Sequence, residues 1–413
     1  MSLRTADSPA RPAGARPAPL RVVVLGYLVR GPLGGLAWHH LQYVAGLAHL
    51  GHEVLFIEDS DDYPGCVHLD GRPVDTDPQE GLAFAARAFS RLGLDARWAY
   101  HDAHAGHWLG PAGEQAEAFC RSADVVLNVS GINPLRPWWV NAPLRVLIDT
   151  DPVFTQVRQL HSEAGRAYAD AHNAFFTFAE NISRNDCTVP DDGLAWRPTR
   201  QPVVLDAWPV EPAPPTSPFT TIMQWDSYRT VEHAGVSYGM KSRSFEPYFD
   251  LPQHCRVPLE LAVGGASRPP RQRLKAAGWR LRNPIDIARE PWDYQDYIIA
   301  SAGEFSIAKH GYVISRSGWF SERSANYLAA GRPVVVQDTG FTDVLPAGEG
   351  LLAFNTPDEA VAMLDCVHGD LPRHAAAARK IAERYFDARN VLAGLLEQAV
   401  EAAGLSCRAG TER

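Results

Sequence analysis

Charged and hydroxyl side chains crowd the start of an expected helix in GYVISRSGWFSERSANYLAAGRPVVVQDTGF, residues 311–341. Ser321 can cap this helix, and Glu322, Arg323 and Asn326 share roughly one side of its first turns because they lie three or four residues apart. Helix amides and an arginine suit phosphate oxygens, whereas carboxylate and amide oxygens accept hydrogen bonds from ribose hydroxyls. We therefore predict that this helix start binds a nucleoside diphosphate. A capped amphipathic helix with a solvated face is the alternative.

Lysine is rare in this chain, with four among the 39 basic residues, and two of the four fall in loop-like stretches. Lys241 lies in YGMKS and Lys309 lies in IAKHG. A compact ammonium group suits a diphosphate as a point charge, so we predict that both contact its phosphates, with solvated surface lysines as the alternative. Ser324 is assigned to the same site, and Glu304 is expected to bind ribose or to orient Lys309.

A second anion-binding feature is expected in GPLGGLAWHH, residues 31–40. Gly34 and Gly35 would let backbone amides approach a ligand at the positive start of the next helix, or would form a tight turn without a ligand. The dinucleotide fingerprint G-x-G-x-x-G is absent here, which disfavours a nicotinamide enzyme. His39 lies in the first turn of the helix and is a candidate base facing a cleft.

The elements that position these residues follow an alternating strand–helix pattern. RVVVL at 21–25 is typical of a strand buried on both faces of a parallel sheet, and a helix that ends at Gly51 leads to the next strand, which makes a βαβ unit. The expected strands are 21–25, 53–57, 124–129, 144–148, 174–178, 220–224, 259–263, 279–281, 311–315 and 334–337. The expected helices include 80–91, 157–171, 271–277 and one that begins near 321.

Five prolines in PVEPAPPTSP, residues 209–218, predict a linker between two α/β domains. The predicted division is a disordered tail at 1–20, an N-terminal domain at 21–208, a C-terminal domain at 219–385, and a C-terminal helix and tail at 386–413. Each domain is expected to be a doubly wound parallel sheet. Ligands bind such sheets outside the carboxyl ends of the strands, so we expect the chemistry in the cleft between the domains.

Composition excludes several classes of protein. The 413-residue chain is 46% hydrophobic and 21% charged, which is typical of a globular protein. No apolar run approaches the ~20 residues of a membrane span, and the first twenty residues lack the apolar centre of a signal peptide, so we expect a cytoplasmic protein. A net charge of −9 argues against a large nucleic-acid footprint and against docking on an anionic membrane. The six cysteines lie far apart and are expected to be reduced thiols.

Three motifs give the chain a resemblance to glycosyltransferases of the GT-B type. Gly34-Gly35-x-x-x-His39 is similar to the GGxxxH start of many members, and GHEV at 51–54 also matches. NYLAAGRPVV at 326–335 resembles the E-A-x-A-x-G-x-P-V-V segment of their donor site. The motifs keep the order and spacing of the family over about 300 residues. The resemblance implies two facing Rossmann-like domains, with the sugar nucleotide held mainly by the second and the acceptor by the first.

On this resemblance, Asp151 in LRVLIDTDP is our first candidate for the general base on the acceptor hydroxyl, and His39 is the second. Asp149 is expected to cap the turn. The pair also looks like the D-x-D metal site of the other large glycosyltransferase architecture, whereas the GT-B resemblance implies that no metal is needed. Three further side chains are predicted to bind the acceptor: Asn128, Asn133 and Trp138. Packing of Trp138 under its loop is the alternative.

The chain departs from the family at two positions, because Gly318 and Asn326 stand where retaining members carry the E-x7-E pair. Glu322 and Arg323 are expected to make those contacts, and both retaining and inverting chemistry stay open. The sequence predicts a metal-independent bacterial transferase that moves a sugar from a UDP- or dTDP-sugar to a small-molecule or natural-product acceptor. The alternatives are a sugar-nucleotide epimerase of the same fold, a non-catalytic sugar-nucleotide-binding protein and a metal-dependent D-x-D enzyme.

Overall fold

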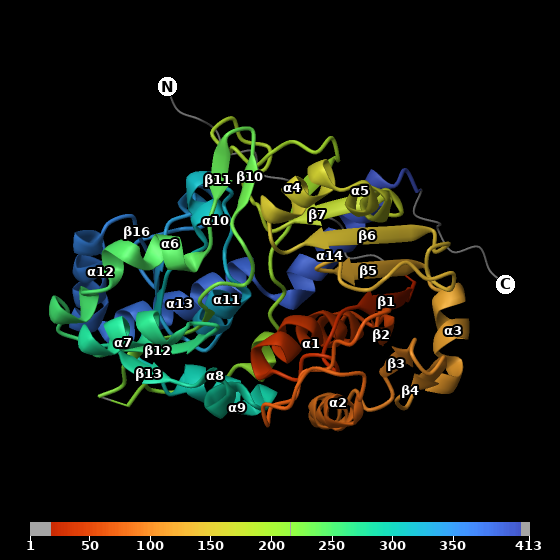
Figure 1. The fold of residues 1–413 in the computed structure, drawn as a ribbon, viewed down its shortest axis with the longest axis horizontal. Coiled ribbons are helices and arrows are strands. Elements are labelled where there is room, and N and C mark those ends of the chain that lie inside the picture. Colours follow the sequence, from red (N-terminus) through yellow and green to blue (C-terminus); the bar gives the residue numbers. More distant parts are fainter. Residues whose placement is uncertain (1–17, 215, 406–413) are drawn as a thin grey trace.

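A computed structural model describes residues 18–214 and 216–405 and arranges them in two α/β halves that lie side by side (Figure 1). We call the part built on the first sheet the N-terminal half and the part built on the second sheet the C-terminal half. The tail predicted at 1–20 lies outside the described residues as far as residue 17. No helix of the described chain is long and apolar enough to cross a membrane.

The sheet of the N-terminal half has eight strands in the order β4-β3-β2-β1-β5-β6-β7-β8, and every pair is parallel except β3–β4. Its central strand β1 has three adjacent valines that are fully buried, as expected for a strand covered on both faces. The strands are β1 Arg21–Leu25, β2 Glu53–Asp59, β3 Trp98–Asp102, β4 His107–Leu109, β5 Val125–Val129, β6 Leu144–Asp149, β7 Ala174–Thr177 and β8 Trp196–Pro198.

The helices that cover this sheet include one from the far end of the chain. The last helix, α14, packs on α1 and joins the core of the N-terminal half (Figure 1). The helices are α1 Gly34–His49, α2 Gln79–Arg91, α3 Gly113–Arg121, α4 Phe154–His161, α5 Glu163–Asp170 and α14 Ala388–Ala402. A single helix was predicted at 157–171; the chain instead forms α4 and α5, because Ser162 adopts an extended backbone and caps α5 through its side chain.

The sheet of the C-terminal half has six parallel strands in the order β13-β12-β9-β14-β15-β16. A separate hairpin, β10–β11, reaches toward α4 of the other half. The strands are β9 Phe219–Gln224, β10 Val231–His233, β11 Val236–Tyr238, β12 Leu259–Gly264, β13 Arg280–Arg282, β14 Gly303–Ser306, β15 Val334–Gln337 and β16 Leu351–Phe354. The helices are α6 Lys241–Phe245, α7 Arg268–Ala276, α8 Pro284–Ala288, α9 Pro291–Ile299, α10 His310–Ile314, α11 Glu322–Ala329, α12 Pro357–Gly369 and α13 Leu371–Tyr385.

One predicted strand of the C-terminal half is wrong. Residues 311–315 were expected to form a strand, but 311–314 belong to helix α10 and Ser315 follows its end, and the neighbouring strand is β14 (GEFS) a few residues earlier. A short apolar run fits a strand or a buried helix equally well, and β14 carries two polar side chains, Glu304 and Ser306, that hide it from a hydrophobicity pattern. This shift changes which side chains face the cleft.

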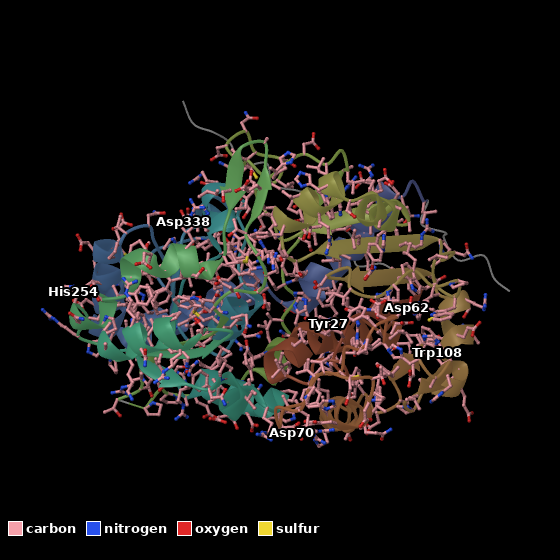
Figure 2. All side chains as sticks on the ribbon, in the orientation of Figure 1. Tyr27, Asp62, Asp70, Trp108, His254 and Asp338 are labelled. Carbon is pink, nitrogen blue, oxygen red and sulfur yellow. The ribbon has the colours of Figure 1, made fainter. Side chains whose placement is uncertain are left out.

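The two halves meet along α1, which packs against α9. The indole of Trp38 donates a 2.7 Å hydrogen bond to the carbonyl oxygen of Pro291. Gln42 links α1 to α11 by donating from Nε2 to Oδ1 of Asn326 at 2.9 Å. Figure 2 shows side chains along this boundary, where Tyr27 lies, whereas Asp62 lies toward the outer side of the N-terminal half. The contacts fix how the strand ends of the two sheets face each other.

Candidate functional site

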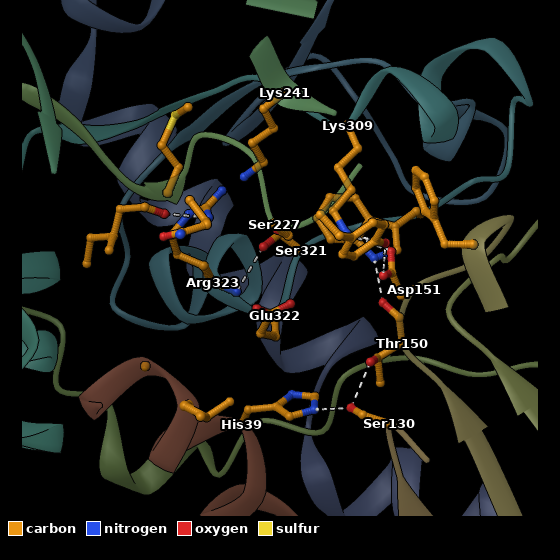
Figure 3. A pocket seen from close by; sticks show the side chains of 18 of the residues that line it. His39, Ser130, Thr150, Asp151, Ser227, Lys241, Lys309, Ser321, Glu322 and Arg323 are labelled. Carbon is orange, nitrogen blue, oxygen red and sulfur yellow. Dashed lines mark hydrogen bonds and ion pairs between the residues drawn. The ribbon is translucent and has the colours of Figure 1, made fainter. Parts of the chain in front are cut away.

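A cavity of about 850 Å³ lies between the two halves, at the carboxyl ends of both sheets. On the N-terminal side its walls come from the loops after β1, β5 and β6, which supply Tyr27, Ser130 and Asp151. On the C-terminal side they come from the end of β9, the start of α6, the segment after β14 and the start of α11 (Figure 3). Strand ends that face one another are where ligands bind in sheets of this kind.

Lys241 is the first residue of α6, and its side chain points toward Arg323 (Figure 3). The residue is only 9% exposed, and its ammonium makes no hydrogen bond or ion pair with any described residue. Burial, together with the charges of Arg323 and Lys309, lowers the pKa of Lys241 to about 7. A buried ammonium without a counter-ion is costly, so this position favours an anion from outside the chain.

Arg323, in the first turn of α11, is held by three acceptors. Its Nε donates to Oε1 of Glu304 at 2.6 Å, its Nη1 to the carbonyl oxygen of Ile222 at 2.7 Å, and its Nη2 to Oγ of Ser306 at 2.6 Å. Burial acts to lower the pKa of Arg323, but the negative charge of Glu304 raises it overall. The guanidinium therefore stays charged in a fixed orientation on the cavity wall.

Glu304 does not do what the sequence suggested. It is fully buried in β14, does not line the cavity, and pairs with Arg323 instead of Lys309. Its second oxygen, Oε2, has no hydrogen-bond partner among the described residues. The predicted ribose contact does not fit this placement, because strand β14 turns the Glu304 side chain into the core, where it pairs with Arg323.

Of the polar residues predicted at the start of α11, some line the cavity and others are buried away from it. Ser321 caps the helix by accepting a 3.2 Å bond from the backbone N–H of Arg323, and Ser321 and Glu322 both line the cavity. Glu322 has no hydrogen-bond partner in the described part of the chain, and Figure 3 shows it facing His39 across the cavity. Ser324 is buried behind the wall, and Asn326 is buried against Gln42. These last two do not line the cavity, because Ser324 faces the ends of β14 and β15 within the C-terminal half and Asn326 faces α1.

Gly34 and Gly35 serve the contact between the halves. A Cβ at Gly34 would lie 2.3 Å from the carbonyl oxygen of Glu290, and a Cβ at Gly35 would lie 2.9 Å from the ring of Tyr294. Gly35 borders the cavity, whereas Gly34 does not. The close approach that the glycines allow is therefore to α9 and the residue before it, and the expected anion contact at Gly34 is not where the cavity lies.

His39 lies on α1 and lines the cavity opposite α11. Its Nε2 is 3.4 Å from Oγ of Ser130, which in turn hydrogen-bonds Oγ1 of Thr150 at 2.8 Å. Burial lowers the pKa of His39, and the nearby charge of Glu322 acts in the opposite direction. A neutral imidazole at this position can accept a proton or a hydrogen bond from a ligand hydroxyl.

Asp151 lines the cavity, and donors from the other half surround it. Lys309 Nζ donates to Oδ1 at 2.8 Å, and the hydroxyl groups of Tyr228 and Tyr312 also donate to this carboxylate. Burial, with the charge of Asp151 as the next cause, raises the pKa of both tyrosines. Both carboxylate oxygens of the predicted base therefore already accept hydrogen bonds from the C-terminal half.

Asp149 points away from the cavity and stabilises the loop after β6. It accepts from the backbone N–H of Asp151 at 2.9 Å, from Gln156 Nε2 at 3.0 Å and from Thr177 Oγ1 at 2.8 Å. Burial raises its pKa. The two aspartates thus do not converge on one point. No cluster of three or more His, Cys, Asp or Glu side chains that could hold a metal is found within residues 18–214 and 216–405.

The three predicted acceptor contacts lie outside the cavity. Both asparagines are buried: Asn128 in β5 donates to the hydroxyl of Tyr168 in α5 at 2.7 Å, and Asn133 donates to the carbonyl oxygen of Gly26 in the loop after β1 at 2.9 Å. The ring of Trp138 packs on His101, with ring centroids 4.7 Å apart. None of the three lies on the cavity wall, because each side chain packs on or bonds to a partner inside the N-terminal half.

The residues that the sequence analysis missed include Tyr228 and Tyr312, the two tyrosines that donate to Asp151. Tyr312 stands three residues after Lys309, which is the spacing of neighbours on one helix face. That signal was available in IAKHGYV, but the prediction of a strand at 311–315 concealed it. Tyr228 lies in the segment between β9 and β10 and carries no local signal of its own.

The chain is similar in three dimensions to several glycosyltransferases. AviGT4, involved in avilamycin A biosynthesis, matches with a TM-score of 0.50 and 15% identity over 94% of this chain and 99% of that chain. An α-glucosyltransferase in complex with UDP and DNA matches with a TM-score of 0.53 and 10% identity over 93% and 100%. HepE from Anabaena, in complex with UDP and glucose, matches with a TM-score of 0.52 and 10% identity over 92% and 100%.

No protein-family model and no curated protein sequence matches the chain. At these identities the structural likeness establishes the fold: two Rossmann-like domains face a cleft in the GT-B arrangement, as the sequence predicted.

Proposed function

We propose that this protein is a glycosyltransferase that moves a sugar from a nucleoside-diphosphate sugar, with a UDP- or dTDP-sugar favoured, to a small-molecule or natural-product acceptor. The observation that carries the proposal is the buried, unpaired ammonium of Lys241 beside the fixed guanidinium of Arg323, on the wall of the cavity. Two such cations suit a diphosphate, which carries negative charge and accepts hydrogen bonds from both groups. Structural neighbours that hold UDP support this choice of ligand.

On this proposal, Lys241, Arg323 and Lys309 stabilise the charge that develops on the diphosphate as it leaves. Cations fixed before the reaction need no reorganisation when that charge appears, so they lower the barrier directly. We also propose that these three side chains provide the charge that a divalent ion provides elsewhere, so that transfer needs no metal. His39 and Glu322 face each other across the remaining space and would hold hydroxyl groups of the transferred sugar.

The acceptor is proposed to bind between Ser130, Thr150 and the aromatic side chains of Phe154 and Trp319 on the same cavity wall. A net charge of −9 disfavours a polyanionic acceptor such as DNA, although one structural neighbour was captured with DNA. The part AviGT4 plays in avilamycin A biosynthesis favours a natural-product acceptor. A bacterial, cytoplasmic setting stays a prediction from composition.

Thermal unfolding with UDP, dTDP, GDP or ADP, each with and without Mg²⁺, tests the donor site. A ligand at 100 times its dissociation constant adds roughly 2.7 kcal/mol to the folded state, so we expect one of these nucleotides to raise Tm by a few degrees without metal. Lys241→Met should remove most of that shift. Lys275→Met, which removes an exposed lysine of α7, is the matched control and should keep it. If none of the four nucleotides stabilises the protein, the proposal is wrong.

Transfer itself is tested by incubating the donor sugar with candidate acceptors. Release of nucleoside diphosphate that depends on the acceptor is the expected result, whereas conversion of the donor into an isomer without any acceptor would indicate an epimerase. Nucleotide binding with neither outcome would indicate a non-catalytic binding protein.

A further inference from the structure

Lys309 and Asp151 form an ion pair on the cavity wall, and this pair links the C-terminal half to the N-terminal half. Asp151 belongs to the loop after β6, and Lys309 precedes α10, so 158 positions of sequence separate them. The Lys309 ammonium lies 2.8 Å from Oδ1 of Asp151 and 2.9 Å from the hydroxyl of Tyr228. The hydroxyl groups of Tyr228 and Tyr312 complete the contacts of the carboxylate.

The ammonium of Lys309 is fixed by aromatic rings as well as by charge. It lies 4.9 Å from the ring centroid of Phe154, 4.5 Å from that of Tyr228 and 5.4 Å from that of Tyr312. Cation–π contacts of this kind hold an ammonium in place without neutralising it. Its side chain is 12% exposed, and Lys309 lines the cavity. The three rings therefore hold the Lys309 ammonium in place at the cavity wall.

The carboxylate of Asp151 occupies the anion position of that site. A carboxylate oxygen and a phosphate oxygen accept the same hydrogen bonds from an ammonium and from tyrosine hydroxyls. Lys241, on the same cavity, has no such partner. The cavity wall thus carries two ammonium groups of different kinds: Lys309 is paired with a carboxylate of the chain, and Lys241 forms no ion pair with the described residues.

We propose that Asp151 is an internal competitor of the donor diphosphate: it pairs with Lys309 as the structure shows, and a donor phosphate oxygen displaces it. This inference rests on the proposed function. Once displaced, the Asp151 carboxylate is free to accept a hydrogen bond from an acceptor hydroxyl, which Lys309 and the two tyrosines otherwise prevent. Donor therefore binds before acceptor, and Tyr228 and Tyr312 are positioning residues that hold the carboxylate until exchange.

The affinity for UDP tests the exchange, measured by calorimetry on the full chain. Asp151→Asn removes the competing charge and keeps the side-chain shape, so we expect it to bind UDP about tenfold more tightly than the wild type. Asp62→Asn is the matched control, because Asp62 is an exposed aspartate that pairs with Arg136 toward the outer side of the N-terminal half (Figure 2). It should bind UDP as the wild type does.

A double-mutant cycle separates displacement at Lys309 from general repulsion. Lys309→Met keeps an apolar side chain among the rings and should weaken UDP binding, and Asp151→Asn should give no gain in this background. A tenfold gain that persists without Lys309 would show that Asp151 only repels the nucleotide, and the exchange would be rejected. Unchanged or weaker binding by Asp151→Asn, with normal binding by the wild type, would also reject it. Absence of UDP binding by every variant would overturn the donor assignment and this inference together.

Discussion

The two halves share one architecture but treat the anion site at their strand ends in opposite ways. In the N-terminal half, three successive amides after β1, those of Leu28, Val29 and Arg30, donate to the carboxylate of Glu58 at 2.5, 2.6 and 2.8 Å. Glu58 is fully buried, and burial raises its pKa although Arg30 and the amides oppose this. In the C-terminal half, no carboxylate of the described chain forms an ion pair with Lys241, although the charges of Glu322 and Glu304 act on it from a greater distance. A loop at the end of a strand can thus bind a ligand anion only where no carboxylate of the chain already occupies the anion position.

This difference explains why fold alone does not locate the donor. Amides that point into one space form a concave anion site, and the first half satisfies them from within. Arg323 in the second half also pairs with a buried carboxylate, Glu304, but that pair lies behind the wall and leaves the guanidinium on the cavity. In the N-terminal half, the buried Glu58 occupies the anion site itself. In the C-terminal half, the buried Glu304 instead fixes the orientation of Arg323 on the cavity wall.

The largest effect is expected on stability, from removing the Glu58 carboxylate that accepts from the loop after β1. Glu58→Ala leaves three buried amides and the buried Arg30 without their acceptor, so we expect the free energy of unfolding to fall by about 3–5 kcal/mol. Chemical denaturation measures this loss. Glu58→Gln, which keeps one acceptor oxygen, should lose less. A Glu58→Ala variant as stable as the wild type would contradict the comparison.

The second-largest effect is expected from replacing Arg323, whose guanidinium pairs with Glu304 in the C-terminal half. Arg323→Lys keeps the charge but cannot satisfy three acceptors at once, so we expect the affinity for UDP to fall by about tenfold to a hundredfold. Arg280→Lys is the control: it makes the same substitution at an exposed arginine of β13 and should leave the affinity for UDP unchanged. Equal affinities of wild type and Arg323→Lys would remove Arg323 from the donor site.

A smaller effect is expected from pH. Lys241 is mostly charged below its pKa of about 7 and mostly neutral above it, and a bound anion favours the charged form. The affinity for UDP should therefore fall as pH rises from 7 to 9, by about tenfold, because binding then requires uptake of a proton. Calorimetry across this range measures the slope, which Lys241→Met should abolish. A slope that persists in this variant would assign the proton to another group.

Local sequence predicted the elements whose signals are local. The central strand β1 and the strand β15 begin and end at the predicted residues, and Ser321 caps α11 as expected. The cavity collects Asp151, Lys241 and Arg323 because parallel strands present their carboxyl ends at one edge, which strand order alone implies.

Residues in the interface between the halves escaped prediction. Gly34 and Gly35 look like an anion-binding turn in the sequence, but what they permit is close packing on Glu290 and Tyr294, more than 250 positions away. Tyr228 and Tyr312 reach Asp151 only after the halves have docked. No local pattern encodes a contact of that range.

By itself, the sequence determined the alternation of strands and helices, the cap of α11 and the kinds of side chain that meet at the strand ends, because hydrophobic period and capping chemistry act over a few residues. Tertiary structure decided which polar groups remain available. Glu304, Asn326 and Asn128 satisfy partners inside the protein, and Asp151 is paired across the cleft, whereas Lys241 is left without a counter-ion. The physical reason is that most buried polar groups are paired, and the packing of distant segments decides which side chains find a partner inside the protein and which do not.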